Sequence, residues 1–198
     1  MFKKINIVFK KNWILLVILI VGLSLRSYRY AEFPIAGETA DEVAWTLLGA
    51  SIIQEGQPTS WSYFGSYKDF IYQDNGEGKA PWVRPTVDHP PLFSLIPGFL
   101  HTFKNSWDQI PSMKLIRFPL VIIGTLNVLL LYLVAQKIFR EKKIVYLATL
   151  IYAVVPTFVL SSRLVVAENL LTTWMLLAIY LVKSKLKYRN LFLILVSI

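Results

Sequence analysis

The chain has 198 residues, of which 55% are hydrophobic and 17% charged, and its 21 Lys and Arg against 12 Asp and Glu give a net charge of +9. A chain this apolar would collapse or enter a bilayer, which excludes intrinsic disorder. It contains no cysteine, which excludes a disulfide framework, a thiolate nucleophile and a cysteine-based metal site. The basic excess alone would suit a nucleic-acid-binding protein, a protein on an anionic membrane, or a membrane protein with basic cytoplasmic loops.

Residues 1–29 are predicted to form a signal-anchor transmembrane helix with a cytoplasmic N-terminus. Four lysines precede the apolar run 13–25, a pattern that a cleaved secretory signal shares. We favour the anchor, because further apolar segments follow and because Arg26 and Arg29 can extend outward to the membrane surface.

Residues 30–114 are predicted to form a large extracytoplasmic loop. Within it, the acidic opening 37–42 is followed by residues 43–55, and the helical pattern stops at Gly56-Gln57-Pro58. We expect a surface (juxtamembrane) helix, whose apolar face carries Val43, Leu47, Ala50 and Ile53. Thr39 and Glu42 also fit a capping box, which is the purely structural interpretation of the acidic residues at its start.

Residues 115–198 are predicted to contain the remaining transmembrane helices. The expected spans are about 115–139, 144–162 and 166–182, followed by a truncated segment, 190–198, so we expect the chain to continue beyond its last residue. Pro156 should kink the second of these helices. The predicted fold class is therefore an all-α, multi-pass membrane protein.

The distribution of charge predicts the orientation of the chain. The three segments expected on the cytoplasmic side hold 12 of the 21 basic residues and one of the 12 acidic residues. The other side holds the remaining nine basic and eleven acidic residues, in agreement with the positive-inside rule. The basic excess thus marks the cytoplasmic face of an integral membrane protein, in the plasma membrane or its equivalent, and nothing argues for nucleic acid as a partner.

Three groups of residues on the predicted outer face could carry chemistry. The first is the adjacent carboxylates Asp41 and Glu42, either of which could act as a general base at a lipid–water cleft. The second is His89, held before two prolines, for which a hydrogen bond to Asp88 in a turn is the structural alternative. The third is Arg163 with Glu168, where the arginine could hold a phosphate or simply lie at the interface. For the aromatic run 61–67 we favour an interfacial or structural role over stacking on a sugar.

The order of four motifs resembles the C-type (GT-C), lipid-dependent integral membrane glycosyltransferases, the superfamily of protein O-mannosyltransferases and aminoarabinose transferases. The motifs are Thr39-Ala-Asp-Glu-Val-Ala-Trp, His89-Pro-Pro-Leu, Ile116-Arg-Phe-Pro continuing to Leu129-Leu-Leu-Tyr-Leu-Val-Ala, and Pro156 followed by Ser162-Arg-Leu-Val-Val-Ala-Glu-Asn-Leu-Leu-Thr. Relatives carry many more helices, so the resemblance covers only their N-terminal portion and implies a GT-C-like N-terminal module.

The resemblance implies an inverting enzyme that moves a sugar from a polyprenyl phosphate to an acceptor hydroxyl on a glycan, lipid or protein. Asp41 would deprotonate the acceptor, and Glu42 would orient it or bind a divalent metal in those relatives that have one. Arg163 would bind the donor phosphate and His89 would assist there. At position 168 the family commonly has Asp where this chain has Glu168, and the extra methylene could change its reach. No cofactor is otherwise implied.

Two other classes remain open at this point. A transporter or channel fragment would place charges near mid-depth of the bilayer, whereas these charges collect at one surface. A non-catalytic membrane assembly subunit would not bring Asp41, His89 and Arg163 together.

Overall fold

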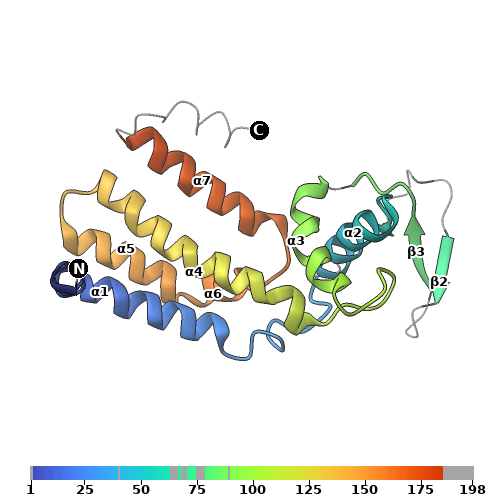
Figure 1. Ribbon diagram of the computed structural model, residues 1–198, viewed down its shortest axis with the longest axis horizontal. Coiled ribbons are helices and arrows are strands. Elements are labelled where there is room, and N and C mark those ends of the chain that lie inside the picture. The colour runs from blue at the N-terminus through green and yellow to red at the C-terminus, as the bar shows by residue number, and fades with distance from the viewer. Residues whose placement is uncertain are drawn as a thin grey trace. The chain divides into compact units, whose positions relative to one another are not determined.

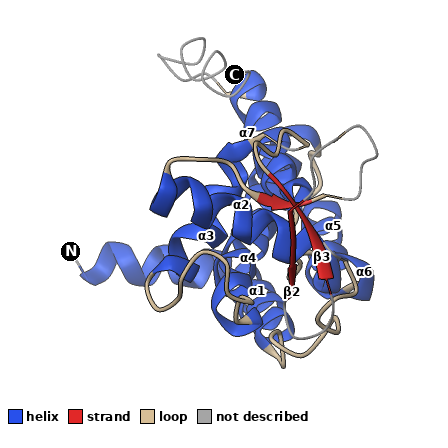
Figure 2. Ribbon diagram, turned by 90° about the vertical axis from the view of Figure 1, so that its right-hand side faces the viewer, coloured by secondary structure: helices blue, strands red, loops and turns tan. Residues whose placement is uncertain are grey.

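The structure is a computed structural model that describes residues 2–39, 41–62, 67, 71–74, 79–88 and 90–184 and is mostly helical (Figures 1 and 2). It divides into two compact units. The first comprises Met1–Tyr28, Val121–Ser162 and Asn169–Ile198, and the second comprises Arg29–Leu120 and Arg163–Glu168.

Among the described residues, the first unit is formed wholly or in part by the helices α1 (Phe2–Ser27), α4 (Met113–Ile138), α5 (Lys142–Val154), α6 (Pro156–Ser161) and α7 (Ala167–Lys183). The second unit contains α2 (Asp41–Glu55), α3 (Pro91–Thr102) and the strands β1 (Ser60–Trp61), β2 (Ile71–Asp74) and β3 (Lys79–Val83), and it also includes the beginning of α4.

Helix α4 confirms the helix predicted over 115–139 and has the length of a membrane span. Its 26 residues include an 18-residue window of mean hydropathy 2.3. At 1.5 Å per residue the helix is about 39 Å long, which exceeds the roughly 30 Å of a bilayer core. Among the described residues no other helix meets the same length and hydropathy criteria, since the apolar part of α1, Asn12–Ser27, is shorter.

The helix predicted over 144–162 is interrupted where Pro156 was expected to kink it. Helix α5 ends at Val154, Val155 is extended (φ −63°, ψ 126°), and α6 starts at the proline. Proline has no N–H to donate to the carbonyl four residues earlier, so the helical hydrogen bond to Tyr152 O is lost. The interruption therefore leaves carbonyl groups at the end of α5 in need of other donors.

Arg26 supplies those donors, and the prediction that it extends outward is wrong. Its side chain is fully buried, and its guanidinium donates to Tyr152 O at 3.2 Å and Ala153 O at 3.0 Å. A cation at the C-terminal end of α5 is also favoured by the helix dipole. Arg29, in contrast, is exposed and pairs with Glu32.

In the second unit, α2 and α3 touch backbone to backbone through Gly49 and Gly98. A Cβ atom added to Gly49 would overlap the carbonyl of Ser94, and one added to Gly98 would overlap the backbone at Gly49 and Ala50. The helices can approach this closely only because neither glycine has a side chain.

We expect Gly49→Ala to destabilise the second unit by about 1–3 kcal/mol or more, because the new methyl group meets backbone that cannot rotate away. Thermal unfolding in detergent, followed by tryptophan fluorescence, measures the effect. Gly22→Ala in α1 is the control, since its Cβ would lie 3.4 Å from Ala153 Cβ, an ordinary contact. Equal melting temperatures for both variants would contradict the tight α2–α3 contact.

Helix α2 is buried more completely than a surface helix with one apolar stripe. Of the residues on the face expected to be apolar, Val43, Leu47 and Ala50 are buried within the unit, whereas Ile53 is 41% exposed. The helix also buries polar and small residues on its other sides: Glu42, Thr46, Gly49 and Ser51. It is therefore the central helix of the second unit.

The prediction of an all-α fold needs correction, because the second unit contains a small antiparallel sheet in the order β1-β3-β2 (Figure 2). Strand β3 lies in the middle, with Trp82 opposite Trp61 of β1 and Ile71 of β2. The buried Trp82 makes edge-to-face contacts with Trp61 and Trp107, and Val43 and Leu47 of α2 belong to the same hydrophobic cluster. The sheet thus packs on the helix that carries the acidic pair.

Candidate active site

The two carboxylates of the acidic pair have opposite environments. Both lie in the first turn of α2, where negative charge is favoured by the helix dipole. Asp41 is exposed to solvent, whereas Glu42 is buried, with only 1% of its side chain accessible. Adjacent residues on a helix point in directions about 100° apart, so one faces the interior and its neighbour does not.

Glu42 forms a buried, two-pronged ion pair with Arg117 of α4. Arg117 Nε donates to Glu42 Oε1 at 2.8 Å and its Nη2 donates to Oε2 at 2.5 Å. Arg117 Nη1 also donates to two carbonyl oxygens, Tyr30 O at 3.1 Å and Pro34 O at 2.7 Å. The pair thereby joins α2, the start of α4 and the segment that follows α1.

The same carboxylate also binds the segment that contains Arg163. The backbone N–H of Val165 donates to Glu42 Oε1 at 3.0 Å. Arg163 is 4% exposed, and its Nη1 donates to Phe33 O at 3.0 Å. Burial, together with the positive charge of Arg117, lowers the pKa of Arg163. The structure therefore brings the acidic pair and Arg163 into one region of the second unit.

The capping box predicted from Thr39 and Glu42 does not form. Both oxygens of Glu42 accept hydrogen bonds from Arg117, and Oε1 also accepts one from Val165. Thr39 Oγ1 is buried and has no hydrogen-bond partner among the described residues. The buried guanidinium outcompetes the backbone because it makes two hydrogen bonds in which donor and acceptor are both charged, whereas the capping box offers the carboxylate one bond from a neutral N–H.

His89 lies outside the described residues, but its neighbour Asp88 is well defined. The Asp88 carboxylate accepts hydrogen bonds from Ser62 Oγ and Tyr67 Oη, both at 2.5 Å. Burial and the bond to Asp88 raise the pKa of the Tyr67 phenol. For Trp61 and Tyr67 the structural interpretation of the aromatic run thus has direct support: one packs on Trp82 and the other holds the loop before α3.

Glu168 stands in the first turn of α7 and is exposed. It belongs to the second unit, as do the other candidate residues that the structure describes: Asp41, Glu42 and Arg163.

Among the described residues we find no suitable set of ligands for a divalent metal. They contain no group of three His, Asp or Glu side chains arranged to hold a metal ion. A metal at Glu42 would have to displace Arg117 from both carboxylate oxygens. The environment of Glu42 therefore does not fit a metal ligand.

Sequence reasoning assigned no role to Arg117. Its motif, Ile116-Arg-Phe-Pro, was recognised, and an arginine at the start of an apolar helix is a signal in itself, because a charge there needs a partner when buried. Nothing in the sequence indicates that the partner lies 75 residues earlier in the chain.

The described residues thus combine a membrane-length apolar helix with a unit that holds an acidic pair and a buried arginine. Residues 88–198 match the family model described as dolichyl-phosphate-mannose-protein mannosyltransferase. The chain belongs to this family.

The chain is also similar to dolichyl-phosphooligosaccharide-protein glycotransferase 2 of Archaeoglobus fulgidus, with 27% identity over 159 residues. The matched region covers 79% of this chain but 24% of the relative, so the chain spans about a quarter of that protein's length. No solved structure matches it.

Proposed function

We propose that this chain carries the catalytic base of a glycosyltransferase that moves a sugar from a polyprenyl-phosphate donor to an acceptor hydroxyl on the extracytoplasmic face. The acceptor is a glycan, lipid or protein, and the reaction inverts the anomeric carbon. The names of the family and of the archaeal relative both include dolichyl-phosphate-linked sugars, which supports the donor class. The loss of sugar transfer in an Asp41→Asn variant of the full-length protein is the test.

The proposal rests on the difference in burial between the two residues of the acidic pair. A general base must reach the hydroxyl whose proton it takes, and Asp41 is the exposed member. Glu42 is held by Arg117 and Val165, so it cannot move to a substrate without leaving a buried arginine unpaired. In this scheme Asp41 is catalytic and Glu42 is a positioning residue.

Arg163 is the proposed partner of the donor phosphate. Its guanidinium is desolvated and lies near the charge of Arg117, and both effects lower its pKa. The negative charge of an anion beside it would favour the charged guanidinium and so offset both effects, which makes the position suitable for a phosphate group. We assign supporting contacts with the donor phosphate or sugar to His89 and Glu168.

The chemistry follows from these roles. Asp41 takes the hydroxyl proton as the acceptor oxygen attacks the anomeric carbon, and the bond from that carbon to the phosphate oxygen breaks. The electron pair leaves with the polyprenyl phosphate, whose negative charge Arg163 neutralises. One glycosidic bond forms and one glycosyl phosphate bond breaks. The direct displacement inverts the configuration.

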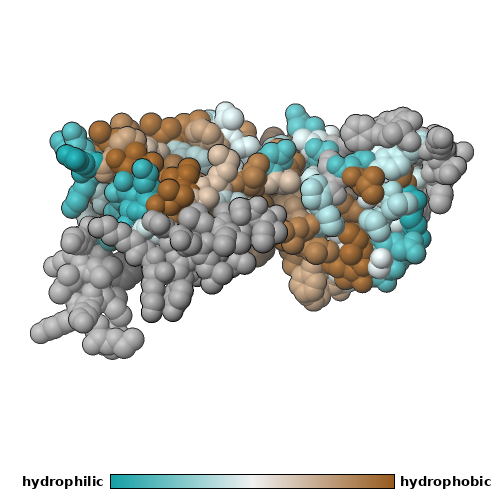
Figure 3. Space-filling view, turned by 90° about the horizontal axis from the view of Figure 1, so that it is seen from above, coloured by the Kyte–Doolittle hydropathy of each residue, from teal (hydrophilic) through white to brown (hydrophobic). Residues whose placement is uncertain are grey.

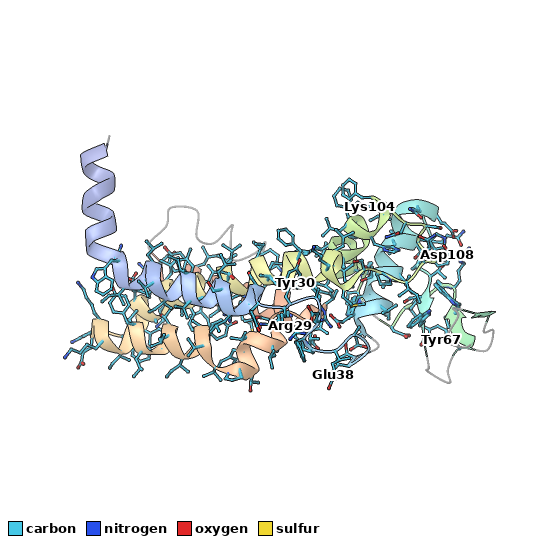
Figure 4. All side chains as sticks on the ribbon, turned by 90° about the horizontal axis from the view of Figure 1, so that it is seen from below. Arg29, Tyr30, Glu38, Tyr67, Lys104 and Asp108 are labelled. Carbon is cyan, nitrogen blue, oxygen red and sulfur yellow. The ribbon has the colours of Figure 1, made fainter. Side chains whose placement is uncertain are left out.

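The proposed topology places residues 30–114 outside the cytoplasm and the turn between α4 and α5 inside it. The chain has no cysteine, so a single cysteine introduced in place of an exposed residue can be labelled specifically. Glu38, labelled in Figure 4, tests the side of the loop, and Glu141 tests the side of the turn. In intact cells, a membrane-impermeant maleimide should label Glu38→Cys, and it should label Glu141→Cys only after the membrane is opened. The reverse labelling pattern would refute the orientation and the proposed face of the reaction.

A further inference from the structure

A cavity of about 610 Å³ lies within the second unit, formed by the segment after α1, the end of α3 and the start of α4. Its volume falls within the range of roughly 300–1,000 Å³ typical of small-molecule sites. Leu100, Leu115 and Phe118 give it apolar walls. Tyr30 and Lys104, which line it from two different segments, are labelled in Figure 4.

The charged side chains among the described residues that line the cavity are both positive. They are Lys104 and Lys114. Both lysines are exposed, and neither forms an ion pair with an acidic side chain of the described residues. Lys114 stands in the first turn of α4, where the helix dipole disfavours a cation. Its charge is therefore not explained by the stability of the helix.

An exposed apolar stripe on α3 leads to this cavity. Leu92, Phe99 and Phe103 are 67%, 55% and 66% exposed, and at 100° per residue they lie within about 40° of one another around the helix axis. The opposite face of α3 carries the buried Ser94, Gly98 and His101. Phe103 is followed directly by Lys104, and the cavity residue Phe118 is itself 54% exposed. Hydrophobic surface on this unit is visible in the space-filling view (Figure 3).

We propose that the cavity binds the phosphate headgroup of an anionic bilayer phospholipid between Lys104 and Lys114, with the stripe on α3 resting in the outer leaflet. The two ammonium groups meet the phosphate, the apolar walls meet the first part of an acyl chain, and exposed aromatic rings are typical of membrane–water interfaces. The lipid is a component of the bilayer, distinct from the sugar donor assigned to Arg163. Helix α3, rather than α2, is then the helix that lies on the membrane.

Native mass spectrometry of the full chain, released from nanodiscs, tests this site. With phosphatidylglycerol nanodiscs we expect one retained lipid per chain, and with phosphatidylcholine nanodiscs none. The double variant Lys104→Gln/Lys114→Gln should lower the retained fraction by about tenfold or more, because each lysine contributes to attraction of an anionic headgroup. Lys142→Gln/Lys143→Gln removes the same charge from exposed residues outside the cavity and should retain the lipid.

A second variant distinguishes lipid binding in the cavity from attraction of the lipid to surface charge in general. Leu100→Trp fills the cavity without changing its charge and should also release the lipid, with thermal unfolding in detergent showing that the variant is folded. Equal lipid retention in the cavity variants and in the control would overturn the proposal. Retention of added undecaprenyl phosphate without retention of phosphatidylglycerol would overturn it as well, because the site would then belong to the donor lipid.

Discussion

Asp41→Asn is expected to abolish sugar transfer from polyprenyl-phosphate donors while the protein remains folded in the membrane. Asparagine has nearly the same shape but cannot accept the acceptor's proton, and removal of a general base typically costs about 10²–10⁴-fold in rate. The side chain is exposed, and loss of its charge at the start of α2 costs about 0.3–1 kcal/mol of helix stability. Transfer of a radiolabelled sugar by the full-length protein measures the effect.

The matched control for this variant is Asp108→Asn. Asp108 is also an exposed aspartate of the second unit, but it lies after α3 and has no assigned role in the reaction. It should keep its activity, and both variants should reach the membrane in equal amounts. Undiminished turnover by Asp41→Asn would refute the assignment of the base and, with it, the mechanism proposed for the acidic pair.

Arg117→Met is expected to destabilise the second unit strongly. The substitution leaves Glu42 with a buried charge and no cation, and breaking a buried ion pair in this way costs about 3–5 kcal/mol. It also removes the hydrogen bonds that Arg117 donates to Tyr30 O and Pro34 O. The melting temperature in detergent, followed by tryptophan fluorescence, should fall well below that of the unsubstituted protein.

Arg84→Met provides the comparison for the Arg117 variant. Arg84 pairs with Glu55, but the two side chains are 37% and 35% exposed, and pairs so exposed to solvent contribute about 0–1 kcal/mol. In the double variant Glu42→Leu/Arg117→Met no charge is left buried, so much of the lost stability should return. If the double variant were no more stable than Arg117→Met, the buried charge would not be the cause of the destabilisation.

The long helices were predictable because their signal is local. An uncharged run of membrane length predicted the bounds of α4 to within a few residues. The missing N–H of Pro156 predicted the position of the break between α5 and α6. The sheet was not predicted, because its strands are short and Pro81 lies inside β3, a residue that normally argues against a strand. Its stability depends on Trp82 packing against residues from other segments.

The sequence suggested candidate site residues, but it did not predict the environment of each. The motifs indicated Asp41, Glu42 and Arg163, and the structure places all three in one unit. The resemblance suggested different roles for the two carboxylates, but the sequence did not predict which of them is buried, because that depends on which one meets Arg117. A contact between residues 42 and 117 is a property of the folded chain and leaves no local pattern.

The contact between Arg26 and the end of α5 has a consequence for how the protein assembles. Helix α1 is synthesised long before Tyr152 and Ala153, so during synthesis its arginine has none of the carbonyl partners that it has in the finished bundle. Without these partners, the free energy of the guanidinium is lowest at a membrane surface, where a flexible side chain can keep the charge hydrated. Arg26 therefore gains its two carbonyl partners only once α5 has formed beside α1, which ties the burial of this arginine to the assembly of the two helices.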